Sequence, residues 1–268
     1  MDLSHVSVLM GVYYRRADTA LLRRSIESVL NQTVHDFELL ICDDGSTDAA
    51  LALLDKMADK DGRIRLVRNG ALFSLPQKLN ACLAESTGGY IARMDDDDFS
   101  HPDRFAAQVD ALCSHPDIAF VGSVVNLCRS GETVGVRGLP EYPEVKDFYF
   151  TQPYIHPTLM FRREALLAVG GYSEDRYCDL CEDYDLLLRL YANGFRGMNL
   201  QEALFDYTVP ETAKGSRKMR HRWNETVTRW RRFRELGVLP GALPYVVKPL
   251  AVGLVPEKAL KKLKEMKQ

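Results

Sequence analysis

The sequence lacks any uninterrupted apolar run of about 18 residues, which is the length that a membrane-spanning helix needs. No basic segment precedes the short apolar stretch at residues 6–10, so no secretory signal is expected. Internal repeats and low-complexity segments are also missing. With 46% hydrophobic and 27% charged residues in 268, the composition excludes a disordered chain and a small disulfide scaffold. We expect a cytoplasmic protein that buries a sizeable core.

The sequence has few cysteines in any metal-binding pattern. Six are scattered, mostly through apolar segments, which favours reduced thiols used as small core residues. Cys178 and Cys181 form a Cys-x-x-Cys pair, but no second such pair or pair of histidines accompanies it. Because a zinc site needs about four ligands, the pattern disfavours a structural metal there, and a redox role still more.

The formal net charge of −2 hides an uneven distribution of charge. Residues 1–213 contain 20 Lys and Arg against 33 Asp and Glu, whereas residues 214–268 contain 15 against 4. This division predicts cation or ligand chemistry in the acidic body and an anionic partner for the basic tail. Solvated surface helices are the alternative interpretation of the tail.

Strand-like and helix-like segments alternate through the first half of the chain. Apolar runs at 6–12, 37–42, 64–67 and 90–94 predict strands, and helical spacing of apolar residues predicts helices between them. We expect Asp18 or Thr19, and later Asp48, to cap two of these helices. The alternation is typical of an α/β fold with a mostly parallel sheet and helices on both faces.

The pattern loosens after about residue 115. We expect four further strands, at 118–121, 124–127, 158–162 and 203–207. We expect one further helix, at 182–193.

Two acidic clusters follow predicted strands. Asp43 and Asp44 come after the second strand, and residues 95–98 are four consecutive aspartates after the fourth. Ligands of an open parallel sheet bind beyond the carboxyl ends of its strands. Carboxylates hold Mg²⁺ or Mn²⁺, which neutralises a diphosphate, and they accept hydrogen bonds from a base or ribose. The alternative interpretation is that these aspartates are solvated residues that cap loops. This alternative is weakest for the four consecutive aspartates, because their mutual repulsion must be compensated. Arg93 is one residue that could balance their charge.

Many segments together, in order over residues 5–208, resemble the family 2 glycosyltransferases. The matching segments are 6–13, 28–33, 37–39, 43–48, 89–98, 102–104, 156–158, 161–163, 170–172 and 182–185. The resemblance implies a GT-A fold over residues 1–213, with a Rossmann-like, mostly parallel sheet flanked by helices. Its nucleotide-binding half would end near residue 115, its acceptor half would cover 116–213, and 214–268 would be a basic, amphipathic, helical C-terminal extension.

The resemblance also implies a pocket for the nucleotide of a nucleotide-sugar donor. Val12, Tyr13 and Asp44 would contact the base and ribose, with Asp43 nearby. Residues 69–77 depart from the family's usual glycine-rich stretch, which bears on the sugar-side contact expected of Lys78.

The family's Asp-x-Asp motif falls on Asp95, Asp96 and Asp97. The resemblance implies that Asp97 binds a divalent metal, Mn²⁺ or Mg²⁺, and that Asp95 faces the ribose or a metal-bound water. The family's inverting base falls on Asp183, which follows Glu182 at the start of a predicted helix, where carboxylates are favoured. Separate carboxylates are thus present for deprotonating an acceptor hydroxyl and for holding the metal that assists the departing diphosphate.

Three further residues are candidates for contacts with the diphosphate or the acceptor. His156 precedes a proline that restrains the backbone, and a structural histidine is an equal alternative. Glu182 adjoins the expected base. Lys214 opens a basic segment placed where mobile loops of this fold close over the diphosphate, and a solvated charge run is equally compatible.

The basic tail combines apolar and cationic residues at helical spacing. Met219, Trp223, Val227 and Trp230 recur among arginines, and the last residues repeat the pattern with lysines. We expect attachment to an anionic membrane surface, on the inner face of the cytoplasmic membrane. Packing on the protein's own body is the alternative, and no feature beyond charge favours nucleic acid.

The leading hypothesis is a metal-dependent, inverting glycosyltransferase. It would move a sugar, most simply from a UDP-sugar, to a hydroxyl of a surface glycan or lipid-linked acceptor. A nucleotidyltransferase is an alternative, but a glycine-rich, basic phosphate loop after the first strand is missing. A catalytically silent subunit that binds nucleotide sugars is the other, and the presence of Asp97 and Asp183 counts against it.

Overall fold

The computed structural model describes residues 5–68, 74–210 and 218–254. Its elements, in chain order, are β1 (Val6–Val12), α1 (Ala20–Leu30), β2 (Phe37–Asp43), α2 (Asp48–Ala58), β3 (Ile64–Val67), α3 (Leu75–Glu85), β4 (Tyr90–Met94), β5 (Phe99–Ser100), α4 (Arg104–Ser114), β6 (Phe120–Arg129), β7 (Glu132–Arg137), η1 (Val145–Tyr149), η2 (His156–Thr158), β8 (Met160–Arg162), α5 (Arg163–Ala168), η3 (Arg176–Cys178), α6 (Glu182–Ala192), β9 (Gly197–Thr208), α7 (Met219–Glu235) and α8 (Leu243–Leu254).

Within these residues, nine strands form one sheet in the order β3-β2-β1-β4-β8-β6-β9-β5, and β7 pairs with β6 off this path. The first four strands of that order are all parallel, as the alternation of predicted elements indicates. β8 lies antiparallel to both β4 and β6, whereas β6 and β9 are parallel. The fold is therefore α/β, with a fully parallel N-terminal half and a mixed second half.

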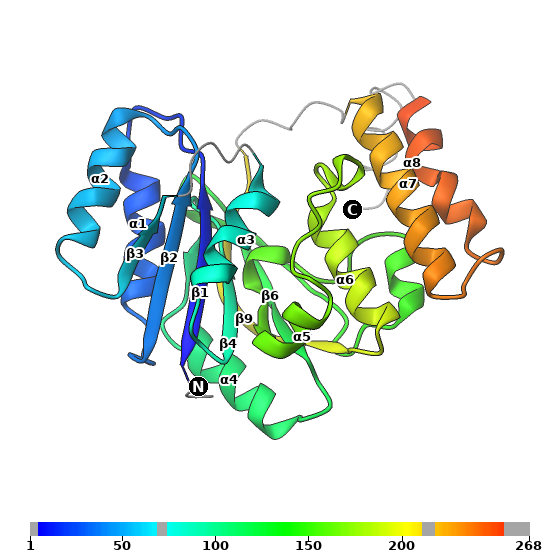
Figure 1. Cartoon of the computed structure of the whole chain (residues 1–268), viewed down its shortest axis with the longest axis horizontal. Helices are drawn as coiled ribbons and strands as arrows, with labels where there is room; N and C mark the ends of the chain where they lie inside the picture. The colour runs from blue at the N-terminus through cyan, green and yellow to red at the C-terminus, as the bar shows by residue number, and fades with distance from the viewer. Residues whose placement is uncertain (1–4, 69–73, 211–217, 255–268) are drawn as a thin grey trace.

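Helices cover both faces of the sheet (Figure 1). One apolar cluster joins alternate residues of β1 with α1, α2 and α4, and a second joins Leu9, on the opposite face of β1, with α3, α5 and α6. Every residue of β1 is consequently buried, which explains why it reads as a continuous apolar run instead of an alternating one.

The second half differs in detail from the sequence-based expectation. The segments expected as strands at 118–121 and 124–127 form one strand, β6, with irregular pairing to its neighbours, and β9 starts at Gly197 instead of 203. The two-residue β5 and the exposed β7 carry too short or too weak an apolar pattern to be predicted. The cap expected at Asp48 is wrong: Thr47 is the N-cap of α2, and its hydroxyl accepts from the Ala50 amide at 3.4 Å.

The two halves of the sheet meet at β8, which is only three residues long. Gln108 of α4 reinforces this junction, because its Nε2 donates to the carbonyl oxygens of Val121 in β6, at 3.0 Å, and of Thr158, at 2.7 Å. Arg162 adds hydrogen bonds from β8 to the carbonyl oxygens of Ile118, at 2.9 Å, and Leu112. Side chains thus supply part of the bonding that a longer strand would obtain from its backbone.

The C-terminal helices α7 and α8 pack against each other at one end of the molecule (Figure 1). Phe233 of α7 is fully buried, and Arg232 Nε forms a 2.7 Å ion pair with Asp185 of α6, whose side chain is also buried. Packing on the body thus holds for α7, while Trp223 and Trp230 remain about half exposed. The amphipathic pattern expected in the final lysine-rich segment lies outside the described residues.

A buried carboxylate joins β2 to β1, β3 and the segment before β4. Glu38 accepts hydrogen bonds from the Ser7 hydroxyl and from the Thr87 amide and hydroxyl, each at 2.7 Å. Arg65 Nη1 donates to its other oxygen at 2.7 Å. Burial raises the pKa of Glu38, but these hydrogen bonds outweigh it and hold the pKa at about 2.

We therefore expect Glu38→Gln to lower the free energy of unfolding by about 2 kcal/mol at pH 7, measured by urea denaturation. Because the pKa of Glu38 in the folded protein lies below its ordinary value of 4.5, the wild-type advantage is complete above that pH. It fades as the pH falls towards 2. Asp59→Asn, on the exposed end of α2, is the control, and equal stabilities of wild type and Glu38→Gln at pH 7 would contradict the prediction.

Candidate active site

The carboxyl ends of β1, β2 and β4 meet at one edge of the sheet. Val12 at the end of β1 pairs with Asp43 at the end of β2, and Met10 pairs with Met94 at the end of β4. The two acidic clusters therefore leave the sheet side by side, as the parallel order requires.

Lys78 of α3 contacts three of the residues expected to bind the nucleotide, Val12, Tyr13 and Asp44. Its Nζ donates to the Val12 carbonyl oxygen and to Asp44 Oδ1, both at 2.9 Å, and both charged side chains are buried. The exposed Tyr13 ring lies beside the same ammonium, with its centroid 5.8 Å from Nζ. Asp43 instead holds the following turn, where its Oδ1 accepts from the Gly45 amide at 3.1 Å and Gly45 takes a φ of 110°.

A buried arginine lies beneath the four aspartates. Arg93, 1% exposed, pairs with Asp95. Burial opposes its charge, but Asp95, Tyr172 and Asp96 together outweigh burial and raise the pKa of Arg93. Arg104 is also fully buried and donates to the Arg93 carbonyl oxygen at 2.8 Å. Burial, and then repulsion from Arg93, lower the pKa of Arg104 to about 9, which leaves it charged at neutral pH. Arg93 thus has the balancing position that its place in the sequence suggests.

Asp95, Asp96 and Asp98 have different surroundings. Asp98 turns inward, where its Oδ1 accepts from the Thr208 amide at 2.7 Å. Asp96 accepts from the Tyr13 amide at 3.4 Å, and burial followed by repulsion from Asp97 and Asp95 raises its pKa to about 6. Asp95 is about one-third exposed and lines a cavity. Asp98 is therefore a structural residue that links β4 to β9, whereas Asp95 faces potential ligands.

The residues present fit a divalent cation that is shared with a donor. No group of three or more His, Cys, Asp or Glu in the described part of the chain is arranged to hold a metal alone. Mg²⁺ and Mn²⁺ favour carboxylate oxygens and are commonly bound by one or two carboxylates together with substrate phosphates. Asp95 and Asp97 can supply those oxygens, and the repulsion that raises the pKa of Asp96 marks unneutralised negative charge beside them.

A cavity of about 430 Å³ brings Asp95 opposite the start of α6. Glu182, Asp183 and His156 also line it, so the predicted base and the metal-side carboxylate face one space. Two donors orient Asp183: Gln152 Nε2 bonds to its Oδ2 at 3.0 Å, and the Tyr184 amide to its Oδ1 at 2.7 Å. Sequence reasoning missed Gln152, because an isolated glutamine in an irregular loop gives no signal.

The other two acceptor-side candidates differ in charge state. Burial, and then repulsion from Asp183, raise the pKa of Glu182 to about 7. His156 is buried and its Nε2 lies 2.8 Å from the Tyr172 hydroxyl oxygen. Burial, followed by the nearby Arg93 charge, holds the pKa of His156 well below its usual range, so this ring is neutral. Lys214 lies outside the described residues.

The Cys-x-x-Cys segment is packed between α6 and α7. Cys181 Sγ lies 3.3 Å from the Tyr177 carbonyl oxygen and 3.5 Å from the Thr228 hydroxyl oxygen. Burial is the main reason that the pKa of both thiols is raised, to about 11 for Cys178. Protonated, buried thiols are poor metal ligands and poor nucleophiles, which agrees with a packing role.

These features define an α/β enzyme with carboxylates on two sides of a cavity at the carboxyl edge of its sheet. Residues 7–170 match the family described as Glycosyl transferase family 2. EpsE of Bacillus subtilis is 36% identical over 252 residues, which cover 94% of this chain and 90% of EpsE. The chain belongs to the family 2 glycosyltransferases.

Two further proteins extend the comparison. UDP-Gal:alpha-D-GlcNAc-diphosphoundecaprenol beta-1,3-galactosyltransferase of Escherichia coli is 28% identical, over 80% of this chain and 78% of its own length. The structure of the mannosyltransferase PcManGT from Pyrobaculum calidifontis, in complex with GDP-Man and Mn²⁺, aligns with a TM-score of 0.65 and 18% identity. It covers 97% of this chain and 79% of PcManGT. The GT-A fold is thereby confirmed.

The raised pKa of Glu182 predicts a pH-dependent gain of stability in Glu182→Gln. The unfolded chain releases this proton near pH 4.5 and the folded protein near 7, so ionisation of Glu182 destabilises the fold increasingly across that range. We expect the free energy of unfolding of Glu182→Gln, measured by urea denaturation, to exceed that of wild type by about 1–3 kcal/mol at pH 8. At pH 5 we expect the two values to differ little. Glu164→Gln, at an exposed site on α5, is the control. A constant difference at both pH values would contradict the assignment.

Proposed function

We propose that this glycosyltransferase is inverting and metal-dependent, and that it transfers a sugar from a UDP-sugar to a hydroxyl of a surface-glycan or lipid-linked acceptor. The observation that carries the proposal is the cavity that Asp95 and Asp183 line together. Inverting transfer needs a base on the acceptor side and charge stabilisation on the leaving-group side, and the two carboxylates supply these positions.

The donor nucleotide would occupy the edge formed by the ends of β1 and β2. Tyr13, which is exposed, would stack on the base, while Val12 and Asp44 would bind base and ribose. Lys78 would hold Asp44 in place through the ion pair described above. Asp43 would fix the turn beside the nucleotide, and Asp96 would contribute to the same pocket.

Asp97 and Asp95 would hold Mn²⁺ or Mg²⁺ together with the donor diphosphate. The bound cation would neutralise the charge that develops on the departing diphosphate. The Mn²⁺ complex of PcManGT supports this choice, as does the carboxylate character of the donor set.

Asp183 would accept the proton of the acceptor hydroxyl. Gln152 and the Tyr184 amide each donate to a different oxygen of this carboxylate and fix its orientation in the cavity. Glu182, with a pKa of about 7, would hydrogen-bond another acceptor hydroxyl, and neutral His156 would line the same cavity. Lys214 remains a candidate for a diphosphate contact.

The nature of donor and acceptor rests on the relatives. The Escherichia coli relative is named for UDP-Gal and a diphosphoundecaprenol-linked sugar, which supports a UDP-sugar donor and a lipid-linked or surface-glycan acceptor. PcManGT binds GDP-Man, so GDP-sugars are the first alternative donors.

A membrane surface is the proposed partner of the C-terminal extension. No helix in residues 5–68, 74–210 and 218–254 is long and apolar enough to cross a bilayer. Met219, Trp223 and Trp230 lie about half exposed on one face of α7, among arginines. Tryptophans flanked by cations favour the interface of an anionic membrane, so we place the enzyme peripherally on the inner face of the cytoplasmic membrane.

The donor prediction is tested by binding and hydrolysis of UDP-, GDP-, dTDP- and CMP-sugars with Mn²⁺ and with EDTA. We expect metal-dependent binding of a UDP-sugar, weakened at least about tenfold in Asp97→Ala. We expect Asp183→Asn to leave donor binding unchanged and to lower transfer by about 10²–10⁴-fold. Asp59→Asn is the matched control. Binding without turnover in wild type would favour a silent subunit, and unchanged transfer in Asp183→Asn would remove the assigned base.

Membrane attachment is tested by cosedimentation with vesicles of phosphatidylglycerol and phosphatidylcholine. We expect the full chain to bind the anionic vesicles, to dissociate as salt rises, and to lose about tenfold in partitioning when Trp223 and Trp230 are both replaced by alanine. Val134→Ala with Val136→Ala, on exposed positions of β7, is the control. Equal binding to vesicles of phosphatidylcholine alone would overturn the proposal.

A further inference from the structure

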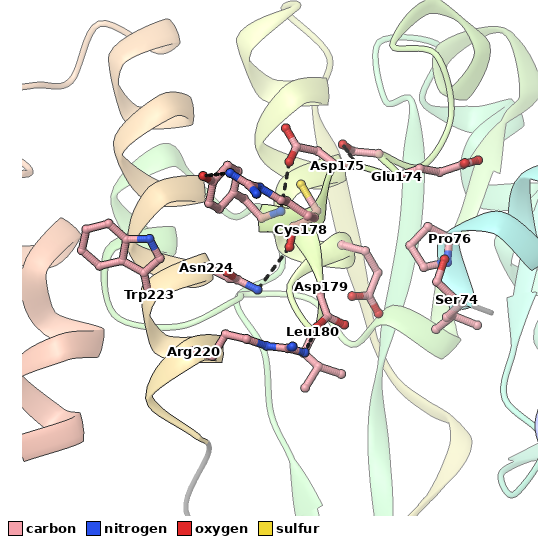
Figure 2. A pocket seen from close by; sticks show the side chains of 15 residues that line it. Ser74, Pro76, Glu174, Asp175, Cys178, Asp179, Leu180, Arg220, Trp223 and Asn224 are labelled. Carbon is pink, nitrogen blue, oxygen red and sulfur yellow. Dashed lines mark hydrogen bonds and ion pairs between the residues drawn. The ribbon is translucent and has the colours of Figure 1, made fainter.

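A second and larger cavity, of about 750 Å³, lies between the start of α3, the loop before α6, and α7. Figure 2 shows Arg220 and Asn224 reaching from α7 towards the loop that carries Asp179, with Ser74 and Pro76 on the opposite side. Its volume is within the range of small-molecule sites, and none of the proposed donor or metal residues lines it.

This cavity continues the acceptor side of the active site. Leu75, Leu180 and Glu182 line both it and the smaller cavity that contains Asp183. A molecule with one hydroxyl at Asp183 therefore extends past Leu180 into the larger space. None of the residues proposed for the nucleotide lines the larger cavity, so we assign the extension to the acceptor.

Leu180 stands at the junction in an unusual conformation. Its φ is 62°, in the left-handed region that favours glycine, and its side chain is 52% exposed. A leucine in this conformation is strained, and backbone strain is concentrated at functional sites. The conformation places an apolar side chain between the two cavities, where the face of a sugar ring that carries C–H groups can pack.

The ionisable residues of the larger cavity disfavour an anionic occupant. Four carboxylates face two guanidiniums, namely Glu174, Asp175, Asp179 and Glu182 against Arg176 and Arg220. Arg220 Nη2 is already paired with Asp179 at 3.0 Å, and Arg231 of α7 pairs with Asp175 at 2.7 Å. With Arg231 counted, four carboxylates stand against three guanidiniums, so the cavity offers a diphosphate no surplus of positive charge, whereas sugar hydroxyls can donate to the carboxylates.

We infer that the larger cavity binds an uncharged sugar unit of the acceptor, adjacent to the unit that is glycosylated. The acceptor is then the end of a glycan of at least two sugars, and any lipid diphosphate lies beyond this subsite. The inference rests on the proposed function, because it takes Asp183 as the place of the reacting hydroxyl.

The test compares neutral acceptors of one and two sugars with the full-length enzyme and its donor. The probes are methyl β-galactoside and methyl β-N-acetylglucosaminide against methyl β-lactoside and methyl β-chitobioside, with farnesyl-diphospho-N-acetylglucosamine as the charged single-sugar acceptor. Nucleotide release gives kcat/KM, and ligand-observed NMR gives binding. We expect a disaccharide to exceed every single-sugar acceptor by about tenfold.

Leu180→Gly removes the side chain at the junction and suits the local backbone, so the variant is expected to fold. We expect it to reduce the advantage of the disaccharide to within about threefold, with a smaller loss of kcat/KM for the single sugars, because Leu180 also lines the cavity that contains Asp183. Ser130→Gly, at another non-glycine residue with positive φ (51°), is the matched control in the β6–β7 turn.

Three outcomes overturn the inference: equal use of one- and two-sugar acceptors, a preference for the farnesyl-diphosphate acceptor, or no binding of any neutral glycoside. Metal-dependent hydrolysis of the donor without acceptor, lost in Asp97→Ala, reports separately on the proposed function. An enzyme that hydrolyses its donor but shows any of these three outcomes retains the proposed function and loses the subsite.

Discussion

The row of aspartates after β4 depends on positive charge buried beneath it. Four adjacent carboxylates repel one another, and removing a guanidinium from water is costly unless it is paired. Here the two costs partly offset each other, because Arg93 pairs with Asp95, while Arg104 adds a second buried charge and donates to the Arg93 carbonyl oxygen. This arrangement fixes the direction of the chain as it leaves β4, and with it the positions of Asp96 against β1 and Asp98 against β9.

The same principle extends to the acceptor side. Asp185, in the first turn of α6, is buried between Arg189 of its own helix and Arg232 of α7, each at 2.7 Å. The helix that begins with Glu182 and Asp183 is therefore anchored by a residue outside the segment, 7–170, that matches the family. Arg229 and Glu225 of α7 also line the Asp183 cavity. Helix α7 of the basic extension thus forms part of the wall of the candidate active site.

Much of the nucleotide-side half could be predicted from sequence, because buried parallel strands are continuous apolar runs and their carboxyl ends carry the acidic clusters. The contact of Lys78 with Asp44 could not, since it depends on how α3 crosses the sheet. Around Asp183, the residues Gln152 and Leu180 and the side chains of α7 are far apart in the sequence and line one cavity only in the folded chain. The four aspartates look equivalent in sequence, and only burial separates inward-facing Asp98 from Asp95.

The junction at β8 has a consequence for how such an enzyme diversifies. Three residues of strand join the two halves of the sheet, and the Gln108 and Arg162 side chains supply part of the remaining bonding. Hydrogen bonds between backbone groups do not depend on residue identity, whereas hydrogen bonds made by side chains are gained or lost by a single substitution. The relative placement of the two halves of the sheet is therefore open to change by single substitutions, while the strands of each half stay as they are.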